Sequence, residues 1–438
     1  MGAPNPTKIN NMKYTENVNW LFSLQRFGIK PGLVRINRLL KRLGHPERKF
    51  PSILVAGTNG KGSTCAIINS ILTEAGYKTG LYTSPHILSF RERIRLGRYD
   101  YISSDYVNDF INYNKSFIES NGITFFEATT AMAFDYFARS NIDIAVVEVG
   151  MGGRWDATNI IRPILSIITS ISLDHTEYLG KTLKAITKEK SCISRNNKPL
   201  IYSEKIFHKN ILLATSATPK ISSKTTPLEL KKIGVENMQL KWGNELVNSK
   251  LVGIHQVDNV GVAITAVNEL KNMSWTITKD SVVNGIVRAE WPGRFQVVMK
   301  KPLTILDVAH NPDGARRLRE TLVHVHETKD SLTIICGIMA DKDYKSFLRE
   351  LDRGQDVLFA VSPKIERSLR HKEIADCARR YNYTGVYEYE SVVEAVEAAL
   401  LDGRPMLIVG SHHTVEEALL ALDFLLGIRL PNMIYGEM

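Results

Sequence analysis

Residues 55–64 of the 438-residue chain read VAGTNGKGST, and this stretch decides the fold. An apolar run at residues 53–56 leads into the glycines, and a helical pattern that ends near Gly76 follows them. A buried strand, a glycine-rich loop and a helix in this order are typical of a phosphate-binding loop. Glycines let backbone N–H groups approach phosphate oxygens at the positive end of the helix. The stretch therefore predicts nucleotide binding.

The loop departs from the usual P-loop spelling, G-x-x-x-x-G-K-[ST]. Val55 occupies the position of the first glycine, and Gly62 follows Lys61 where a hydroxyl is usual. The hydroxyls come one step later, at Ser63 and Thr64. Lys61 can still neutralise the β- and γ-phosphates of a nucleotide. The predicted ATP-binding loop consists of Thr58, Asn59, Gly60, Lys61, Gly62 and Ser63.

Short apolar runs at residues 80–83, 142–149 and 164–171 alternate with helix-like segments. Such alternation predicts a parallel, doubly wound sheet whose ligand sites lie at the carboxyl ends of the strands. Residues 18–27 and 33–43 show helical spacing before the first strand. Further helices are expected after the loop and at about residues 257–270. Residues 209–248, rich in Ser, Thr, Lys and Asn, are expected to form a less regular insertion that closes the first domain.

The sequence WPGR at residues 291–294 breaks this pattern, and a second alternation of apolar runs begins. A chain of 438 residues exceeds one ordinary core, because cores stop growing at roughly 250 to 300 residues. We predict an α/β protein in which a P-loop doubly wound ATPase domain, residues 1–297, precedes a smaller Rossmann-like α/β domain, residues 298–438. The expected strands of the second domain lie at residues 303–308, 332–338, 357–361, 386–389 and 406–409.

Polar side chains follow several predicted strands. Glu148 ends one apolar run and His175 follows another, so both fall where a nucleotide's magnesium would be held. By spacing alone, a single histidine is more often structural than a ligand. Lys190, in KEKS, would normally be a solvated charge on a helix face. Asp307, His310 and Asn311 crowd one strand end, and helix capping would explain only Asn311.

Composition favours a soluble globular protein, with 44% hydrophobic and 23% charged residues. The net charge of +10 comes from Lys and Arg scattered along the chain without a basic block. A generally basic surface or acidic small-molecule substrates explain this charge, and we expect no nucleic-acid partner.

The cysteines and the start of the chain bear on the compartment. Four separated cysteines contain no C-x-x-C pair, which favours a reducing compartment over a disulfide framework. Residues 1–13 are polar and lack the apolar core of a signal peptide, and no stretch has the ~18 apolar residues of a membrane span. We expect a cytoplasmic protein without membrane contact.

Ordered motifs run along nearly the whole chain. They are PGLVRINRLLKRLGHP (31–46), VAGTNGKGST (55–64), YTSPHILSFRERI (82–94), FFEATTAMAF (125–134), EVGMGGRWDATN (148–159), LDHTEYLGKT (173–182), KEKSCI (188–193), GIHQVDN (253–259), WPGR (291–294), LDVAHNP (306–312) and ADKD (340–343). These motifs resemble those of the bacterial bifunctional folylpolyglutamate synthase/dihydrofolate synthase family, which is related to the murein amino-acid ligases. Chance does not explain so many blocks in the same order.

The resemblance implies an ATP-dependent ligase. Such an enzyme phosphorylates a carboxylate to an acyl phosphate, which the amine of L-glutamate attacks, and ADP and phosphate leave. The implied acceptors are dihydropteroate and the γ-carboxylate of tetrahydrofolate or its polyglutamates. The implied cofactors are Mg²⁺, in two sites, and a carbamylated lysine, with ATP as the phosphoryl donor. We expect a monomer.

The resemblance also implies residue roles. Ser84, Glu148 and His175 match magnesium ligands, and Lys190 matches the lysine that carbon dioxide converts into an oxygen ligand for a second magnesium. The catalytic residues would be Lys190, His310 and Lys61. Positions that match nucleotide contacts are Asn259, Arg294 and Asp307, and those that match substrate contacts are Asp156, for the pterin, and Ser411, for glutamate.

Some positions depart from the family pattern. Ser191 and Cys192 follow the lysine in place of Ala-Gly, and Val308 replaces a glycine before the Ala-His pair. His412 and His413 follow Ser411 where the family often has a tyrosine. The glutamate-site role of Ser411 is therefore left open.

Two other functions remain open. A murein-type ligase that acts on a UDP-sugar would need a separate nucleotide-sugar domain of roughly a hundred residues before the P-loop, and only about fifty residues precede it here. A P-loop ATPase of another class would use the same loop and the same positive charge.

Overall fold

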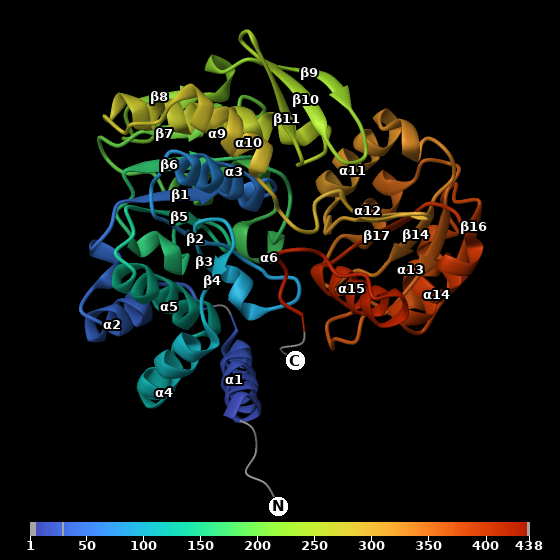
Figure 1. Ribbon diagram of the computed structural model, residues 1–438, viewed down its shortest axis with the longest axis horizontal. Coiled ribbons are helices and arrows are strands. Elements are labelled where there is room, and N and C mark those ends of the chain that lie inside the picture. The colour runs from blue at the N-terminus through green and yellow to red at the C-terminus, as the bar shows by residue number, and fades with distance from the viewer. Residues whose placement is uncertain (1–5, 29, 436–438) are drawn as a thin grey trace, which may run out of the picture.

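The computed structural model describes residues 6–28 and 30–435, which form two α/β domains side by side (Figure 1). Residues 1–5 of the polar start considered above lie outside the described range. Among the described helices, none combines the length and the apolar character needed to cross a membrane.

The larger domain is built on an eight-stranded sheet of order β4-β3-β2-β5-β1-β6-β7-β8. In this order, the six strands from β2 onward are parallel to their neighbours. At the other edge, β3 pairs antiparallel with both β2 and β4. The strands are β1 (Ser52–Ala56), β2 (Thr79–Tyr82), β3 (Ile94–Leu96), β4 (Asp100–Tyr101), β5 (Ile144–Glu148), β6 (Leu165–Ile168), β7 (Leu200–Tyr202) and β8 (Lys220–Ser222).

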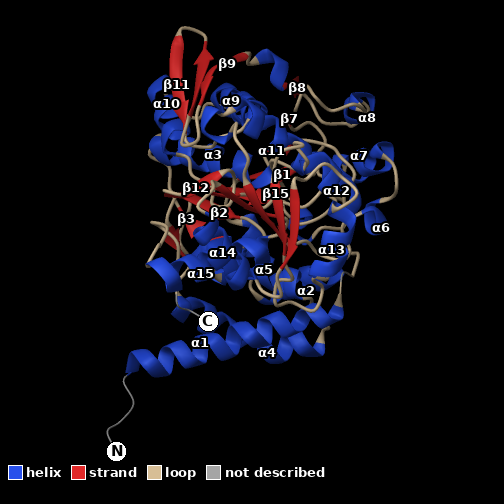
Figure 2. Cartoon of the chain, turned by 90° about the vertical axis from the view of Figure 1, so that its right-hand side faces the viewer, coloured by secondary structure: helices blue, strands red, loops and turns tan. Residues whose placement is uncertain are grey.

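Helices cover both faces of this sheet (Figures 1 and 2). Successive side chains of a strand point to opposite faces. Ile53 and Val55 of β1 therefore pack into one core, with α3 and α9, while Leu54 joins the other core, with α5. The helices are α1 (Pro6–Ser23), α2 (Val34–Arg42), α3 (Lys61–Glu74), α4 (Ser104–Ser120), α5 (Phe125–Arg139), α6 (Thr176–Leu179), α7 (Leu183–Ser191), α8 (Lys209–Leu213), α9 (Ile254–Asn272) and α10 (Lys279–Arg288).

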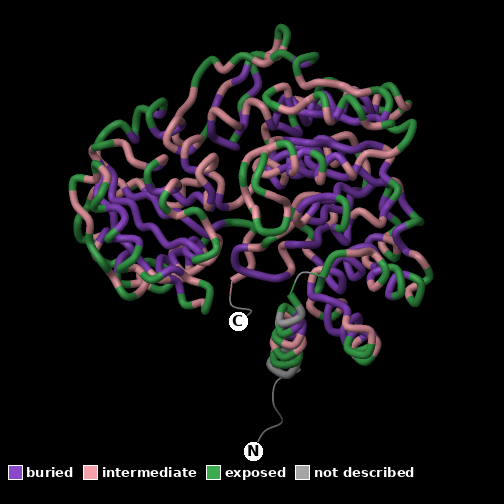
Figure 3. Tube along the Cα trace, turned by 180° about the vertical axis from the view of Figure 1, so that it is seen from behind, coloured by how far each residue is buried: buried purple, intermediate pink, exposed green. Residues whose placement is uncertain are grey.

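The smaller domain has a six-stranded sheet of order β12-β13-β17-β14-β15-β16, in which only β12 is antiparallel to its neighbour. Figure 3 shows buried strands inside an exposed shell in each domain. The strands are β12 (Gln296–Lys300), β13 (Leu303–Leu306), β14 (Thr333–Cys336), β15 (Val357–Ala360), β16 (Gly385–Glu388) and β17 (Met406–Val409). The helices are α11 (Pro312–His324), α12 (Tyr344–Leu351), α13 (His371–Ala378), α14 (Val392–Asp402) and α15 (His412–Leu426).

The predicted α/β class and order of domains are confirmed, but the interpretation of residues 209–248 as irregular is wrong. Its second half, with Ser249, is a three-stranded antiparallel sheet of β9 (Leu228–Ile233), β10 (Met238–Trp242) and β11 (Glu245–Ser249). Met238 and Leu240 are buried in the core that α9 also joins, whereas Gln239 between them is only partly buried. The sheets change between α10 and β12, and the division at residues 297 and 298 stays a prediction.

The last described residues run back toward the larger domain. Leu430 is buried against the smaller domain, while the hydroxyl of Tyr101, on β4, donates a hydrogen bond of 2.5 Å to the carbonyl of Asn432. In Figure 1 the last described residues, coloured red, accordingly lie between the two domains. The domains are therefore joined at residues 289–295 and again at this tail.

Candidate active site

The glycine loop is held in place by the segment that follows β6. The backbone N–H of Thr58 donates to the carbonyl of Ser170 at 2.8 Å, and the Thr58 hydroxyl accepts the N–H of Ser172 at 3.0 Å. The N–H of Asn59 donates to the Ser170 hydroxyl at 3.0 Å. Helix α3 starts at Lys61, directly after Gly60. The loop therefore sits at the amino end of a 14-residue helix, where anions bind well.

At two positions of the loop, close neighbours leave room for no residue larger than glycine. Gly60 has φ +83°, and a Cβ there would lie 2.3 Å from Asn259 Oδ1. A Cβ on Gly62 would lie 2.7 Å from the indole of Trp291. Asn259, itself held by Gln256 at 2.8 Å, thus lies against the loop, as a nucleotide contact would require.

Lys61 lies at the centre of the site. Its ammonium donates to the carbonyl of Thr58 at 3.0 Å. The same charge lowers the pKa values of Lys190 and His175, although burial contributes more to both shifts. It also opposes the rise that burial causes in the pKa of Glu148. Three predicted site residues, from β5, α7 and the segment after β6, therefore lie within the electrostatic influence of Lys61.

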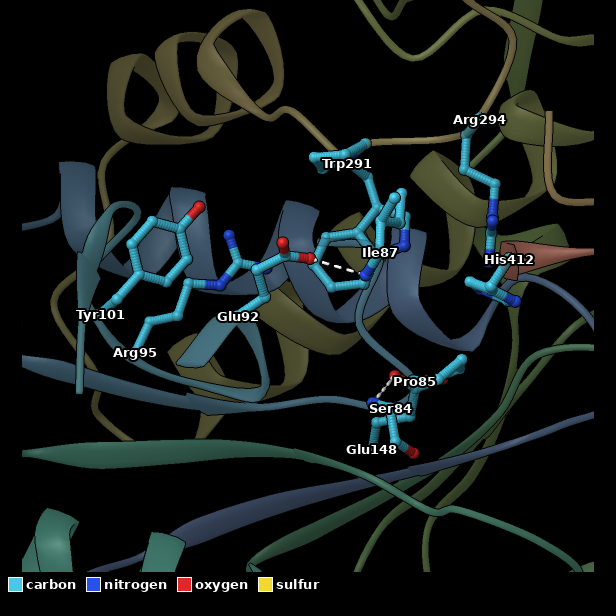
Figure 4. Close-up of a pocket in the computed structure, with 11 residues that line it drawn as sticks. Ser84, Pro85, Ile87, Glu92, Arg95, Tyr101, Glu148, Trp291, Arg294 and His412 are labelled. Carbon is cyan, nitrogen blue, oxygen red and sulfur yellow. Dashed lines mark hydrogen bonds between the residues drawn. The ribbon is translucent and has the colours of Figure 1, made fainter. Parts of the chain in front are cut away.

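Glu148 and Ser84 are brought together at the carboxyl ends of β5 and β2. The backbone N–H of Ser84 donates to Glu148 Oε2 at 3.1 Å. Glu148 is 4% exposed, and burial raises its pKa. Both residues line a pocket that the two domains share (Figure 4). The pocket is lined by Ser84, Pro85, Ile87, Glu92, Arg95, Tyr101, Glu148, Trp291, Pro292, Arg294 and His412.

Lys190 is not a solvated charge, so the interpretation from the helix pattern is wrong. The residue is 4% exposed on α7, and its ammonium donates to the carbonyl of Gly57 at 2.8 Å. Burial, reinforced by the charge of Lys61, lowers the pKa of Lys190 to about 7. A substantial neutral fraction of this amine is therefore present at neutral pH.

His175 follows β6 in a left-handed backbone conformation, with φ 49°. Its side chain is 39% exposed, and burial lowers its pKa to about 4. Within the described ranges, no hydrogen bond or ion pair joins His175 to Ser84 or Glu148. Of the three predicted magnesium ligands, Ser84 and Glu148 are thus in direct contact with each other.

Asp174 is the main polar link from the larger domain to the smaller one. Its carboxylate accepts from Lys342 Nζ at 2.8 Å and from Asn311 Nδ2 at 3.0 Å, and His310 Nε2 lies 3.5 Å away. Burial alone would raise the pKa of Asp174, but His310, His175 and Lys342 hold it well below its usual range. The carboxylate is therefore ionised throughout the physiological pH range.

The P-loop itself contacts the smaller domain. Asn59 Nδ2 lies 3.2 Å from Asn311 Oδ1 and 3.0 Å from Asp313 Oδ2, and Asn311 Nδ2 donates to Asn59 Oδ1 at 3.0 Å. Asn311 also accepts the N–H of Gly314 and so caps α11. Asn311 therefore has a second role besides capping, which is its contact with Asn59 of the P-loop. The contacts of Asp313 and Lys342 had no signal in local spacing, because their partners are far away in sequence.

Removing the Asp174–Lys342 pair should loosen the contact between the domains. We expect Asp174→Asn and Lys342→Met each to increase the radius of gyration in small-angle X-ray scattering and to speed proteolysis within residues 289–295. The double variant should add little, because a coupling of about 0.5–3 kcal/mol is typical of residues in one polar network. Arg379→Met, which removes an exposed pair with Glu388, is the matched control. Additive effects of the two single changes would contradict this coupling.

Asp307 shapes the turn that carries Arg294. Its carboxylate accepts the N–H of Phe295 at 2.9 Å and of Ala309 at 2.8 Å, and burial raises its pKa. Arg294 donates from Nη1 to the carbonyl of Gly293 at 3.1 Å and lines the pocket. His310 Nδ1 donates to the Val308 carbonyl at 2.9 Å, because a carbonyl can only accept, and Nε2 is left facing Asp174.

The two predicted substrate residues cap helices in this conformation. Asp156 accepts the N–H groups of Met151 and Thr158 at 2.9 and 3.0 Å, and its burial raises its pKa. Ser411 accepts the N–H of Thr414 at 3.0 Å at the start of α15. Both side chains are buried, at 8% and 4% exposure. Their contacts fix the loops that follow β5 and β17.

The fold and this site define a P-loop, ATP-dependent enzyme of the two-domain ligase class. The Mur ligase middle domain matches residues 55–267, and the Mur ligase glutamate ligase domain matches residues 293–412. The dihydrofolate synthase/folylpolyglutamate synthase of Bacillus subtilis is 32% identical over 425 residues, covering 92% of this chain and 98% of the relative.

Solved structures agree with these matches. Escherichia coli FolC in complex with DHPP and ADP has a TM-score of 0.80 and 29% identity, covering 93% of this chain and 98% of the other. A bifunctional folylpolyglutamate synthase/dihydrofolate synthase with Mn, AMPPNP and L-glutamate bound has a TM-score of 0.78 and 28% identity, with coverage of 93% and 98%. The chain belongs to the dihydrofolate synthase/folylpolyglutamate synthase family of Mur ligases.

Proposed function

We propose that this chain joins L-glutamate to dihydropteroate, and to the γ-carboxylate of tetrahydrofolate and its polyglutamates, at the expense of ATP. The observation that carries this proposal is the P-loop, which contacts buried Lys190 at Gly57 and the glutamate ligase domain at Asn59. Relatives over nearly the full length are named for both reactions. A murein-type ligase and a P-loop ATPase of another class are the alternatives.

The reaction proceeds in two steps. A carboxylate oxygen of the acceptor attacks the γ-phosphorus of ATP, and the bond to ADP breaks to give an acyl phosphate. The amine of glutamate then attacks the acyl carbon, loses a proton and expels phosphate. Lys61, the helix α3 amino end and Arg294 supply fixed positive charge for the transferred group, which is the main protein contribution in phosphoryl transfer. His310, whose Nε2 lies 3.5 Å from Asp174, would face the phosphate and the amine.

The donor set fits a hard divalent metal such as Mg²⁺. Glu148 is buried with one carboxylate oxygen held by Ser84, and Ser84 adds a hydroxyl. Within the described residues, no three His, Cys, Asp or Glu side chains gather as a metal site. Ser84, Glu148 and His175 would therefore hold one ion together with nucleotide oxygens, which magnesium commonly uses. When bound, the metal stabilises charge on the transferred phosphoryl group.

Lys190 would complete a second metal position as a carbamate. A neutral amine attacks carbon dioxide, forms an N–C bond and releases a proton, which converts a cation into a carboxylate-like ligand. Two observations support this proposal. The amine is buried beside Gly57 of the P-loop, and its pKa is lowered to about 7, so part of it is neutral at physiological pH.

The remaining roles are proposed with the following support. Thr58, Asn59, Gly60, Lys61, Gly62 and Ser63 lie in the loop at the start of α3, and Asn259 lies against it. Asp307 would act on the nucleotide through the turn of Arg294 that it holds. Asp156 and Ser411 would act on pterin and glutamate through the loops they fix. We also propose a cytoplasmic monomer without a nucleic-acid or membrane partner, and four free cysteines support the compartment.

A substrate screen tests the activity. ADP release should require L-glutamate together with dihydropteroate or tetrahydrofolate, and it should form the corresponding amide with each. The two acceptors are assayed side by side, with a UDP-sugar acceptor, DNA and RNA as controls. Polyglutamylation without dihydrofolate formation would reduce the proposal to a single activity. ADP release that needs neither pteroate nor folate would favour another class of P-loop ATPase.

A further inference from the structure

His412 is the first residue of α15 and follows β17 after Gly410 and Ser411. Strand β17 pairs in parallel with β13, so the segments after the two strands leave the sheet at the same edge. The segment after β13 carries His310. The centroids of the two imidazole rings are 6.1 Å apart, with an interplanar angle of 46°. Neighbouring strands thus deliver two imidazoles to one corner of the active site.

The His412 ring lies beside Arg294 in the pocket that also contains Ser84 and Glu148 (Figure 4). An arginine has five N–H donors. Arg294 uses one described hydrogen bond, to Gly293, and forms no ion pair among the described residues. In the same part of the chain, neither ring nitrogen of His412 has a hydrogen-bond partner. Both side chains therefore bring unused donors to one pocket.

The guanidinium of Arg294 places a fixed positive charge beside His412. Burial lowers the pKa of His412 well below its usual range, and Arg294, His310, His413 and His86 act in the same direction. The neutral ring keeps an N–H that can donate without carrying charge.

The two carboxylates in the pocket lining already have partners. Glu92 accepts the N–H groups of Ile87, Leu88 and Ser89, between 2.8 and 2.9 Å. Glu148 accepts the N–H of Ser84. Neither is hydrogen-bonded to His412. Asp307 and Glu148 act electrostatically on Arg294, but among the described residues neither accepts a hydrogen bond from it, so its other N–H groups are available to an external oxyanion.

We propose that His412 and Arg294 together bind an oxyanion of a reacting group, with the His412 N–H donating to one oxygen. Two sources share this chemistry: the phosphoryl oxygens of the acyl phosphate and a carboxylate of the incoming glutamate. The inference rests on the proposed ligase reaction and adds a recognition residue to it.

The test uses a shape-matched and a donor-matched variant of the full chain. His412→Phe keeps a planar ring without a donor, and His412→Gln keeps an N–H. We expect His412→Phe to lose roughly tenfold to a hundredfold in kcat/KM for the substrate whose oxyanion it binds, and His412→Gln to stay within about fivefold. His371→Gln is the control, because His371 also begins a helix, α13, but contacts Ser362 outside the pocket. Circular dichroism verifies folding.

Hydroxylamine distinguishes the two sources, since it attacks an acyl phosphate in place of glutamate and yields a hydroxamate and phosphate. If His412 binds the phosphoryl group, His412→Phe lowers hydroxamate formation as much as ligation. If it binds the carboxylate, hydroxamate formation is unchanged and KM for glutamate rises. Constants for His412→Phe that all lie within about twofold of wild type overturn the inference.

A wild-type chain without ligation would contradict the proposed function rather than this inference. Calorimetric titration with inorganic phosphate and with L-glutamate then tests the site directly. Weaker binding of either probe to His412→Phe supports the inference, and equal affinities for both overturn it.

Discussion

Lys190→Ala is expected to abolish ligation, with a loss of at least roughly a hundredfold to a thousandfold in kcat, while the fold is retained. The reason is position: the side chain is buried and its nitrogen lies 2.8 Å from the carbonyl of Gly57, at the base of the P-loop. Truncation removes a proposed metal ligand next to the transferred phosphoryl group. The measurements are ADP release, amide formation and circular dichroism.

Lys188→Ala is the matched control, since Lys188 lies on the same helix and is exposed. It should keep wild-type turnover. Wild-type turnover in a correctly folded Lys190→Ala variant would contradict the proposed role of Lys190 as a metal ligand. A second arm identifies the functional group: small carboxylates such as acetate should partly restore Lys190→Ala, and bicarbonate should reactivate wild type assayed in CO2-free buffer. Rescue by small amines instead would indicate an ammonium.

Lys61→Ala is expected to lower kcat/KM for ATP by roughly a hundredfold to a thousandfold. Its ammonium lies at the start of α3 and influences Glu148, His175 and Lys190 together. Helix α3 begins with Lys61, so in the Lys61→Ala variant water would take the place of the charge that faces the phosphates. Steady-state kinetics with varied ATP and saturating acceptor and glutamate measure the effect.

Lys78→Ala removes an exposed lysine that lies between α3 and β2, and it should leave kcat/KM unchanged. A Lys61→Ala enzyme with unaltered kcat/KM for ATP would show that the loop does not hold the phosphates. Lys61→Arg separates charge from shape: it keeps a cation but not the compact ammonium, and it should recover only part of the loss.

The parts of the structure that local sequence determines were predictable. Glycines, a lysine and a following helix predict the P-loop, and alternating apolar runs predict both parallel sheets. The short edge strands were not predicted. The strands within residues 228–249 were not predicted either, because an alternation as short as Met238 to Lys241 is hard to distinguish from a loop.

The site was less predictable where it depends on distant residues. The burial of Lys190 follows from its place on the same face of α7 as Ile186 and Thr187, a face that looks polar in sequence. The Asp174–Lys342 pair joins residues 168 positions apart, so no local pattern points to it. Family resemblance identified Lys190 but assigned no role to Asp174.

The return of the tail to Tyr101 limits how the two domains can move. A single connection at residues 289–295 would permit the domains to rotate relative to each other in any direction. A second attachment at Asn432 restricts the domains to rotation about the axis through both attachment points. Opening would then swing Lys342 and His310 away from Asp174 along one arc, and each closure would return them to the same register.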